Sequence, residues 1–249
     1  MNRHASKELS YAVIIPAYNE EDSIAYVLDD MPELLKARVF VADNNSLDKT
    51  ADVARAHGAH VFHEPRQGYG SACLKAISEA RERVNPDVYL FIDADYSDDP
   101  KDLLALLEAM QKDNLDLVIG SRNLGRAEAG SLLPQARFGN WLATTLLHWR
   151  YQYRFTDLGP LRAIKAQALY EIKMQDPDFG WTMEMQVKAL RKNLRVGEIS
   201  AFYRKRIGVS KISGTIKGTF LAGYKILWTL FKYSGPREQA LLSEVNPKS

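Results

Sequence analysis

The sequence predicts an α/β protein: a mostly parallel sheet with helices on both faces. Short apolar runs alternate with segments of helical spacing over the first half of the chain, as in parallel strands joined by crossover helices. The 249 residues are 46% hydrophobic and 26% charged, which suits a globular chain with a sizeable core. The single cysteine, Cys73, excludes an internal disulfide and therefore the small disulfide-rich classes.

Five apolar runs are the expected strands of this sheet. They are residues 11–15, 39–42, 59–63, 87–92 and 115–119. Helices are expected between them, because apolar side chains recur at helical spacing after the first, third and fourth runs. Asn19 or Ser23 can cap the first helix, and Gly58 suits the end of the second. Pro100 can start the helix that precedes the fifth run.

The second half of the chain is less regular. An apolar face at helical spacing predicts a helix over residues 181–194, and residues 194–206 look extended. Residues 214–233 are apolar but contain three lysines. Because no linker is apparent, we expect one domain with short extensions. The expected parts are a tail over 1–10, the α/β domain over 11–213, an amphipathic helix over 214–235 and a tail over 236–249.

Charge and the N-terminus limit the expected partners and location. Thirty-three basic and 31 acidic residues leave a net charge of +2, so no nucleic-acid partner is expected. Residues 191–217 contain eight Lys or Arg and one acid, which suits a phosphate or an anionic lipid. The polar N-terminus lacks the apolar core of a signal peptide, and no apolar run is long enough for a membrane span. These features predict a cytoplasmic protein.

Polar motifs follow four of the expected strands. They read PAYNE, DNNS, DADYSDDP and GSR. Ligands of open α/β sheets bind beyond the carboxyl ends of the strands, so we expect the functional site there. The first turn, PAYNEE, lacks the glycines of a dinucleotide-binding fingerprint, and the chain contains no Walker A sequence.

Asp93 and Asp95 are the strongest candidates for chemistry. They follow an apolar strand and are two residues apart, so both carboxylates can converge on a hard divalent cation. Such a cation could neutralise a nucleotide diphosphate and make it a better leaving group. The alternative is a set of ordinary turn and cap residues. An EF-hand is excluded, because its sixth and twelfth positions would be Asp98 and Leu104.

Three further candidates each have a structural alternative. Asp43 could bind a base or ribose, or belong to a helix cap. Glu184 could be a general base, or form an i,i+4 surface pair with Lys188. The basic segment YRKRIGVSKISGT could grip phosphate oxygens, or be a solvated basic face.

Taken together, these motifs resemble family 2 glycosyltransferases with a GT-A fold, and most closely the dolichol- or polyprenyl-phosphate sugar synthases. The matching stretches cover most of residues 11–218 in the family order. They are VIIPAYNE, VADNNSLDKT, GYGSACLKA, FIDADYSDDP, VIGSR, TDLGPLRAI, GWTMEMQVKA and RKRIGVSKISGT. The sequence departs from the family pattern at three places. Asn44-Asn45-Ser46 stands where such synthases often carry Asp-Gly-Ser, DADYSDDP replaces the common DADLSHHP or DADLQHPP, and Thr156-Asp157-Leu158-Gly159 differs from the usual Ser-Gly-Phe.

The resemblance implies a role for each matching residue. Asp93 and Asp95 would hold Mg²⁺ or Mn²⁺ and the donor diphosphate, and Asp43 would contact the base or ribose. Arg122 matches the Arg of the Gly-Ser-Arg segment. The expected nucleotide-site residues from the first turn are Pro16, Ala17, Tyr18 and Glu20. The expected phosphate-recognition residues are Arg206, Ser210 and Lys211.

The reaction that the resemblance implies is an inverting sugar transfer from GDP-mannose or a UDP-sugar. A polyprenyl phosphate acceptor is already anionic and needs no strong base, whereas a hydroxyl acceptor would need Glu184 or Asp157 as base. Residues 140–149 and 214–233 could lie on a membrane as amphipathic helices, or cover the core or a homodimer interface. Less favoured alternatives are a sugar nucleotidyltransferase and a non-catalytic sugar-nucleotide binding protein.

Overall fold

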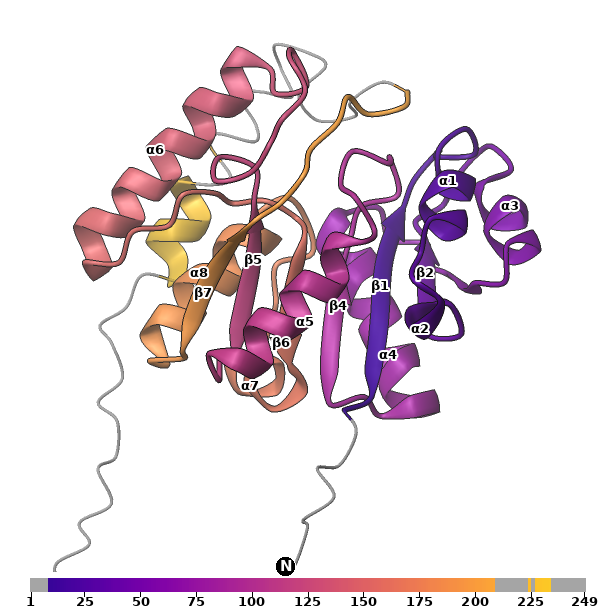
Figure 1. Cartoon of the computed structure of the whole chain (residues 1–249), viewed down its shortest axis with the longest axis horizontal. Coiled ribbons are helices and arrows are strands. Elements are labelled where there is room, and N and C mark those ends of the chain that lie inside the picture. Colours follow the sequence, from indigo (N-terminus) through magenta and orange to yellow (C-terminus); the bar gives the residue numbers. More distant parts are fainter. Residues whose placement is uncertain (1–8, 209–223, 225–226, 234–249) are drawn as a thin grey trace, which may run out of the picture.

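A seven-stranded sheet with helices on both faces forms the molecule (Figure 1). The computed structural model describes residues 9–208, 224 and 227–233. In chain order the elements are β1 (Tyr11–Ala17), α1 (Ile24–Asp29), α2 (Glu33–Lys36), β2 (Val39–Asp43), α3 (Thr50–Ala56), β3 (His60–His63), α4 (Tyr69–Val84), β4 (Val88–Phe91), α5 (Asp102–Lys112), β5 (Leu117–Ser121), α6 (Pro134–Tyr151), β6 (Arg162–Lys165), α7 (Ala166–Ile172), α8 (Trp181–Arg191) and β7 (Val196–Ser200).

The sheet has the strand order β3-β2-β1-β4-β6-β5-β7. The pairs from β3 to β4 and the pair of β5 with β7 are parallel, while β6 runs antiparallel to both β4 and β5. After β3 at one edge, the chain crosses to the other side of β1 to form β4. The strand order therefore reverses between β1 and β4, and ligands of open α/β sheets bind at such a point.

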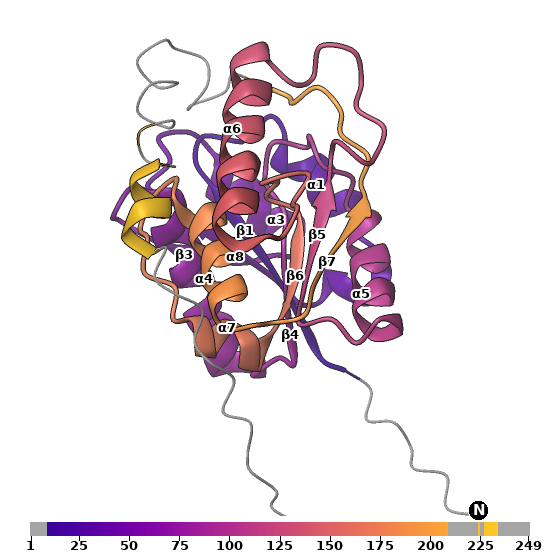
Figure 2. The same cartoon turned by 90° about the vertical axis from the view of Figure 1, so that its left-hand side faces the viewer.

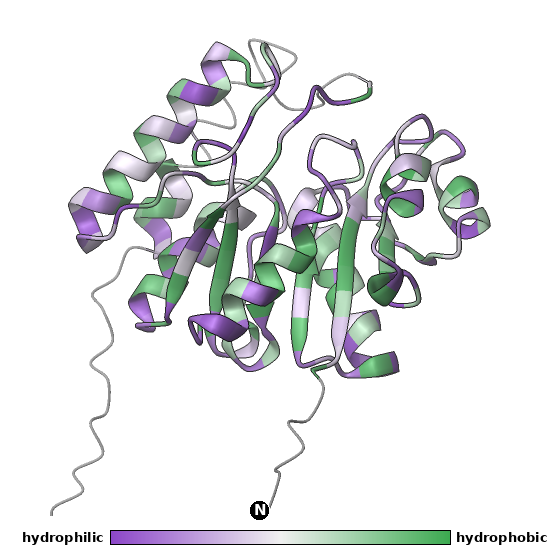
Figure 3. Ribbon diagram, viewed as in Figure 1, coloured by the Kyte–Doolittle hydropathy of each residue, from purple (hydrophilic) through white to green (hydrophobic). Residues whose placement is uncertain are grey.

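Two apolar layers hold the helices against the sheet. One face of the sheet packs against α4, α6, α7 and α8, and the other packs against α1, α2, α3 and α5. Strands β1, β2, β4 and β5 are mostly apolar, as is usual for strands covered on both faces (Figure 3). The predicted α/β architecture with helices on both faces is confirmed.

The structure corrects the expected elements in the second half. Residues 161–172 carried no predicted element, but they form strand β6 and helix α7. In the first half of the chain, the short helix α2 was not predicted either. Residues 194–206 are a strand only over β7, and residues 201–207 continue as an irregular segment beside the loop that follows β4.

The expected amphipathic helix over residues 214–235 falls mostly outside the described residues. Within that range the structure describes Tyr224 and residues 227–233, and both parts are helical. No helix in the described part of the chain is long and apolar enough to cross a membrane.

Candidate active site

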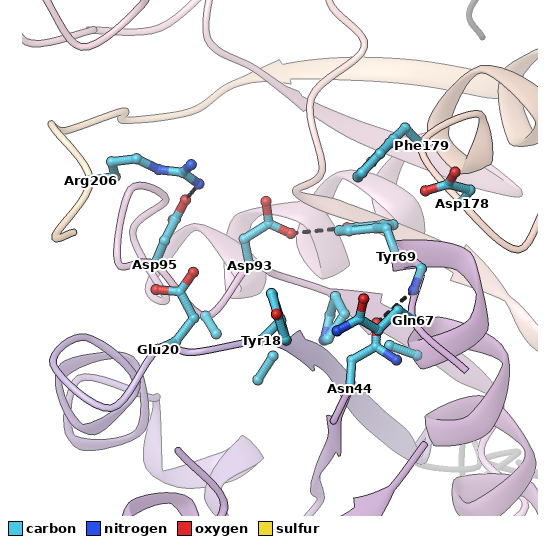
Figure 4. Close-up of a pocket in the computed structure, with 15 residues that line it drawn as sticks. Tyr18, Glu20, Asn44, Gln67, Tyr69, Asp93, Asp95, Asp178, Phe179 and Arg206 are labelled. Atoms are coloured by element: carbon cyan, nitrogen blue, oxygen red, sulfur yellow. Dashed lines mark hydrogen bonds and ion pairs between the residues drawn. The ribbon is translucent and has the colours of Figure 1, made fainter. Parts of the chain in front are cut away.

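A cavity of about 410 Å³ opens where the strand order reverses. Its walls come from the loops after β1, β2 and β4, from the start of α4, and from the turn before α8 (Figure 4). Its lining residues are Pro16, Ala17, Tyr18, Glu20, Asn44, Gln67, Gly68, Tyr69, Ala72, Asp93, Ala94, Asp95, Asp178, Phe179 and Arg206. The cavity thus gathers residues that are up to 190 positions apart in the chain, from Pro16 to Arg206.

The loop after β1 is held in place by the loop after β2. The Asn19 amide donates to Ser46 Oγ at 3.0 Å, and the Glu20 amide donates to Thr50 Oγ1 at 2.7 Å. Asn19 has a φ of 52°, in the left-handed region that asparagine tolerates better than most residues. The Ser23 hydroxyl donates to Glu20 Oε2 at 2.9 Å. These bonds fix Tyr18 and Glu20 on the cavity wall.

Asp93 and Asp95 reach the cavity from the carboxyl end of β4. The Tyr69 hydroxyl donates to Asp93 Oδ1 at 2.9 Å, so the start of α4 orients this carboxylate (Figure 4). Burial raises the pKa of Asp93, although the hydrogen bond from Tyr69 and the charge of Arg206 oppose the rise. A cation at this carboxylate would favour its ionised form.

Asp95 uses its two oxygens differently. Oδ1 accepts hydrogen bonds from the Ser97 amide at 2.9 Å and from the Ser97 hydroxyl at 2.6 Å. Oδ2 faces Arg206, whose guanidinium forms an ion pair with it but lacks the alignment of a hydrogen bond. Oδ2 is therefore the oxygen that remains for a ligand, and Arg206 is the cation that now balances its charge.

Arg206 lies in a segment that is fixed to the loop after β4. The Arg204 amide donates to the Ser97 carbonyl at 2.8 Å, and the Ile207 amide donates to the Asp95 carbonyl at 3.1 Å. This segment brings a basic side chain to the two carboxylates. Ser210 and Lys211, predicted from the same motif, lie outside the described residues.

The opposite wall depends on close packing between the start of α4 and the turn before α8. Gly68 and Gly70 lie against the backbone carbonyls of Pro177 and Asp176, and a Cβ at either glycine would overlap them. The Ser71 amide donates to the Pro177 carbonyl at 2.9 Å. This contact places Asp178 and Phe179 on the cavity wall beside Tyr69 (Figure 4).

Asn44 connects the loop after β2 to the start of α4. Its side-chain amide donates to the Arg66 carbonyl at 2.7 Å, and its Oδ1 accepts from the Gly68 amide at 2.8 Å. The neighbouring Asp43 does not line the cavity, and its Oδ2 lies 3.5 Å from His63 Nδ1. Its predicted contact with a base or ribose stays a prediction.

The half-buried Arg122 and the buried Asp157 form an ion pair outside the cavity lining. Asp157 accepts from Arg122 Nε at 2.7 Å and from Nη2 at 2.6 Å, and also from the Arg122 backbone amide at 2.8 Å. The charge of Asp157 raises the pKa of Arg122 against the effect of burial. Both side chains are committed to each other, so Asp157 is poorly placed to act as a base.

Glu184 is fully buried on α8 and does not line the cavity. Its carboxylate accepts from the backbone amides of Gln175 and Asp176, the latter at 2.7 Å, and pairs with Lys188 Nζ at 2.6 Å. The i,i+4 pair with Lys188 exists as the spacing indicates, but it is buried rather than on the surface. Glu184 therefore supports the turn that carries Asp178.

Seven predicted site residues thus meet at one cavity. They are Pro16, Ala17, Tyr18, Glu20, Asp93, Asp95 and Arg206. Sequence reasoning missed Asn44, Gln67, Tyr69, Asp178 and Phe179. The stretch GYGSACLKA contained a signal for Tyr69, but no local pattern marks Asp178 or Phe179, because packing between α4 and the turn brings them in.

The comparisons with known proteins agree with this architecture. The family described as glycosyl transferase family 2 matches residues 12–173. The chain belongs to family 2 of the glycosyltransferases. An uncharacterized glycosyltransferase of Mycobacterium tuberculosis is 37% identical over 212 residues, which cover 84% of this chain and 93% of that protein. The undecaprenyl-phosphate mannosyltransferase of Micrococcus luteus is 32% identical over 229 residues, covering 82% and 88% of the two chains.

A solved structure shares the fold of this glycosyltransferase. The glucosyl-3-phosphoglycerate synthase of Mycobacterium tuberculosis, in complex with Mn²⁺, UDP and glucosyl-3-phosphoglycerate, superimposes with a TM-score of 0.71 at 20% identity. The match covers 93% of this chain and 82% of that chain. It supports the GT-A fold that the motifs predict.

The protein itself offers few ligands for a metal ion. Among residues 9–208, 224 and 227–233, no group of three or more His, Cys, Asp or Glu side chains could hold one. Two carboxylates nevertheless fit Mg²⁺ or Mn²⁺, because such ions are often held by one or two carboxylates while substrate phosphates and water fill the remaining positions. Asp93 and Asp95 meet this requirement, since both line the cavity that a diphosphate would enter.

Proposed function

We propose that this glycosyltransferase transfers a sugar from a nucleoside diphosphate donor to a polyprenyl phosphate, with inversion at the anomeric carbon and with Mg²⁺ or Mn²⁺ as cofactor. One observation carries the proposal: Asp93, Asp95 and Arg206 line a single cavity at the reversal point of the sheet. Two carboxylates beside a guanidinium suit a diphosphate that brings its own divalent cation.

The reaction exchanges one bond at the sugar for another. A phosphate oxygen of the acceptor forms a bond to the anomeric carbon while the bond from that carbon to the diphosphate breaks. The bound metal ion would stabilise the negative charge on the departing diphosphate. Tyr69 orients Asp93, and Ser97 orients Asp95, so both carboxylates are positioned before the donor arrives.

In this proposal Arg206 interacts with two partners in turn, first Asp95 and then a phosphate group. In the described structure it balances the charge of Asp95. A cation held by Asp95 would compete with this ion pair, and the Arg206 guanidinium would then be available to a phosphate. A guanidinium can hold phosphate oxygens in a bidentate arrangement, which would align the acceptor with the anomeric carbon.

The acceptor class rests on two arguments. The mannosyltransferase of Micrococcus luteus carries undecaprenyl phosphate in its name and is similar over most of both chains. In addition, the two carboxylates predicted as bases are engaged elsewhere, Asp157 with Arg122 and Glu184 with Lys188. An anionic phosphate acceptor needs no proton removed, which fits a site without either base.

A hydroxyl acceptor is the second candidate, and Asp178 favours it. This carboxylate lines the same cavity as Asp93, so an acceptor bound there could meet it (Figure 4). Proton removal by a positioned carboxylate contributes about 10²–10⁴-fold to a rate. The two acceptor classes therefore differ in what they require of Asp178.

The test measures release of nucleoside diphosphate by the full chain with Mn²⁺, using GDP-mannose and several UDP-sugars. Each donor is offered with a short polyprenyl phosphate, with the matching polyprenol, and alone. The proposal predicts release with the phosphate only, a product of inverted anomeric configuration, and an Asp178→Asn variant within about tenfold of the parent, well short of the loss of a base. Release with the polyprenol, together with loss of turnover in Asp178→Asn, would overturn the acceptor assignment.

A further inference from the structure

The outward face of α6 is aromatic, where an ordinary surface helix is polar. Phe138, Trp141 and Trp149 are 59–76% exposed and fall on one side of the helix at 100° per residue. The opposite side packs into the core through Ala143, Leu147 and other buried residues. The helix is therefore apolar on both sides, and its outer side has no covering element among the described residues.

Residues 227–233 show the same arrangement. Trp228 is 48% exposed and Phe231 is 81% exposed, while Thr229 and Tyr233 between them are buried. Tyr233 covers the Lys188 ammonium of α8 at 4.6 Å, and the Arg191 guanidinium donates to the Tyr233 carbonyl at 3.2 Å. The buried side chains fix this helical stretch to α8, so its aromatic side faces outward.

The two helical segments that carry these exposed aromatic residues lie on the same flank of the molecule. Figures 1 and 2 show residues 227–233 beside α6, on the side that faces the viewer in Figure 2. Three of the four tryptophans of the chain are on this flank, and the fourth, Trp181, is buried in the core. We call the set of Phe138, Trp141, Trp149, Trp228 and Phe231 the aromatic flank.

The Lys, Arg, Asp and Glu residues of the two helical segments are all cationic. Residues 134–151 and 227–233 contain Arg137, Arg150 and Lys232 but no Asp or Glu. The three cationic side chains are exposed. Tryptophan at the level of lipid headgroups, with Lys and Arg beside it, is the pattern of surfaces that lie on anionic membranes.

We propose that the aromatic flank binds the surface of an anionic lipid bilayer. Large apolar side chains that gather on one exposed face of a protein often mark an interaction site. A second copy of this chain is a poorer occupant, because it would bring the same cations against Arg137, Arg150 and Lys232. A bilayer with anionic headgroups supplies both the apolar layer for the aromatic side chains and the opposite charge.

Helix α6, which carries three residues of the aromatic flank, also contacts the edge of the sheet at which β5 ends. Asn140, in the first half of α6, donates to the Thr156 carbonyl at 3.2 Å, and the Thr156 hydroxyl lies 2.6 Å from that of Ser121 at the end of β5. Membrane binding would therefore bring the carboxyl edge of the sheet close to the headgroups. The binding itself does not depend on the proposed reaction.

The experiment is co-sedimentation of the full chain with phosphatidylcholine vesicles, with and without phosphatidylglycerol, in the absence of donor and metal. We expect binding to the anionic vesicles, weakened by salt, together with a blue shift of the tryptophan emission. The Trp141→Ala/Trp149→Ala variant should bind at least about tenfold more weakly, because interfacial binding scales with the buried apolar area. Trp228→Ala/Phe231→Ala tests the second helix in the same way.

Tyr26→Ala is the matched control, because Tyr26 is an exposed aromatic residue on α1, away from the aromatic flank. It should bind as the parent does, and circular dichroism checks that each variant is folded. The proposal is overturned if the parent does not sediment with anionic vesicles or if all variants bind equally. It is also overturned if the parent is a dimer that Trp149→Ala separates and that never binds vesicles. If the parent binds vesicles normally but transfers no sugar, only the proposed function is contradicted.

Discussion

Asp98 is a buried carboxyl group in the loop after β4, and neither of its oxygens has a hydrogen-bond partner among the described residues. Burial raises its pKa to about 8, and the charge of Asp93 adds to the rise. An unfolded chain gives Asp a pKa of about 3.9. Between these values the folded protein holds a proton that the unfolded chain has released, so this group stabilises the fold less as the pH rises.

Asp98→Asn should remove this dependence, because the amide has a similar shape and does not titrate. The expected slope from one such group is about −1.4 kcal/mol per pH unit between about pH 4 and pH 8. Urea unfolding of parent and variant at several pH values, with chelator present, measures the difference in unfolding free energy. From pH 5 to pH 8 the unfolding free energy of the variant should rise relative to that of the parent. If the two unfolding free energies change with pH in parallel, Asp98 does not titrate in this range.

Glu184 and Lys188 give a second test at single residues. Glu184→Gln leaves the Lys188 charge buried without its partner, which should cost about 3–5 kcal/mol of unfolding free energy. Adding Lys188→Met should restore most of this stability, since a buried pair can often be replaced by apolar side chains. Thermal unfolding measures both changes.

The double variant also distinguishes a structural role of Glu184 from a catalytic one. If Glu184 only holds the turn at residues 175–176, the refolded double variant should turn over donor within a few-fold of the parent. A base would instead cost about 10²-fold or more in kcat at restored stability. That second outcome would support the role of general base, which is one of the two alternatives that the sequence offers for Glu184.

Individual residues differ in how well the sequence reveals them. Asp93 and Asp95 are recognisable because a local pattern carries them: an apolar strand followed by two carboxylates two residues apart. Asp178 and Asn44 have no such pattern, because the folded chain brings them to the cavity through contacts with α4. The spacing of Glu184 and Lys188 predicts their pairing, but spacing does not tell whether a helix face is covered.

Among the elements, α4 and the turn before α8 determine the width of the cavity. Gly70→Ala would place a Cβ against the Asp176 carbonyl oxygen, so the turn must move. We expect a loss of about 1–3 kcal/mol in stability, as for other overpacked sites, and weaker nucleotide binding. Thermal unfolding and nucleotide titration measure the two effects.

Gly139→Ala on α6 is the matched control for that change, because a Cβ there meets no atom within 4 Å. It should leave nucleotide binding unchanged and slightly raise stability, as alanine does in helices. Equal effects of the two substitutions would show that the contact between α4 and the turn does not shape the cavity.

The sequence reveals some elements better than others for physical reasons. The five predicted strands are apolar and bounded by turn residues, and each overlaps a strand of the structure. Strand β6 escaped prediction because its sequence, RAIK, begins with Arg162 and ends with Lys165, so no apolar run marks it. Its antiparallel position between β4 and β5 follows from long-range pairing that no local pattern contains.

At the scale of the whole molecule, the order of the strands creates the site. The loops after β1 and β4 diverge where the strand order reverses, which leaves the cavity between them. Arg206 then closes the site from a segment near the end of the described core. We propose that this cavity binds a nucleoside diphosphate through Asp93 and Asp95 together with a divalent cation.

Calorimetric titration of UDP and GDP into the full chain tests this claim most directly. With Mn²⁺ present, one of the two nucleotides should bind, and chelation of the metal should weaken that binding by at least about tenfold, which is 1.4 kcal/mol. Asp93→Asn and Asp95→Asn should each lose the metal-dependent part, while Tyr26→Ala should keep it. Equal nucleotide affinity with Mn²⁺ and with chelator, or unchanged affinity in both aspartate variants, would contradict metal-dependent binding of the nucleotide by Asp93 and Asp95.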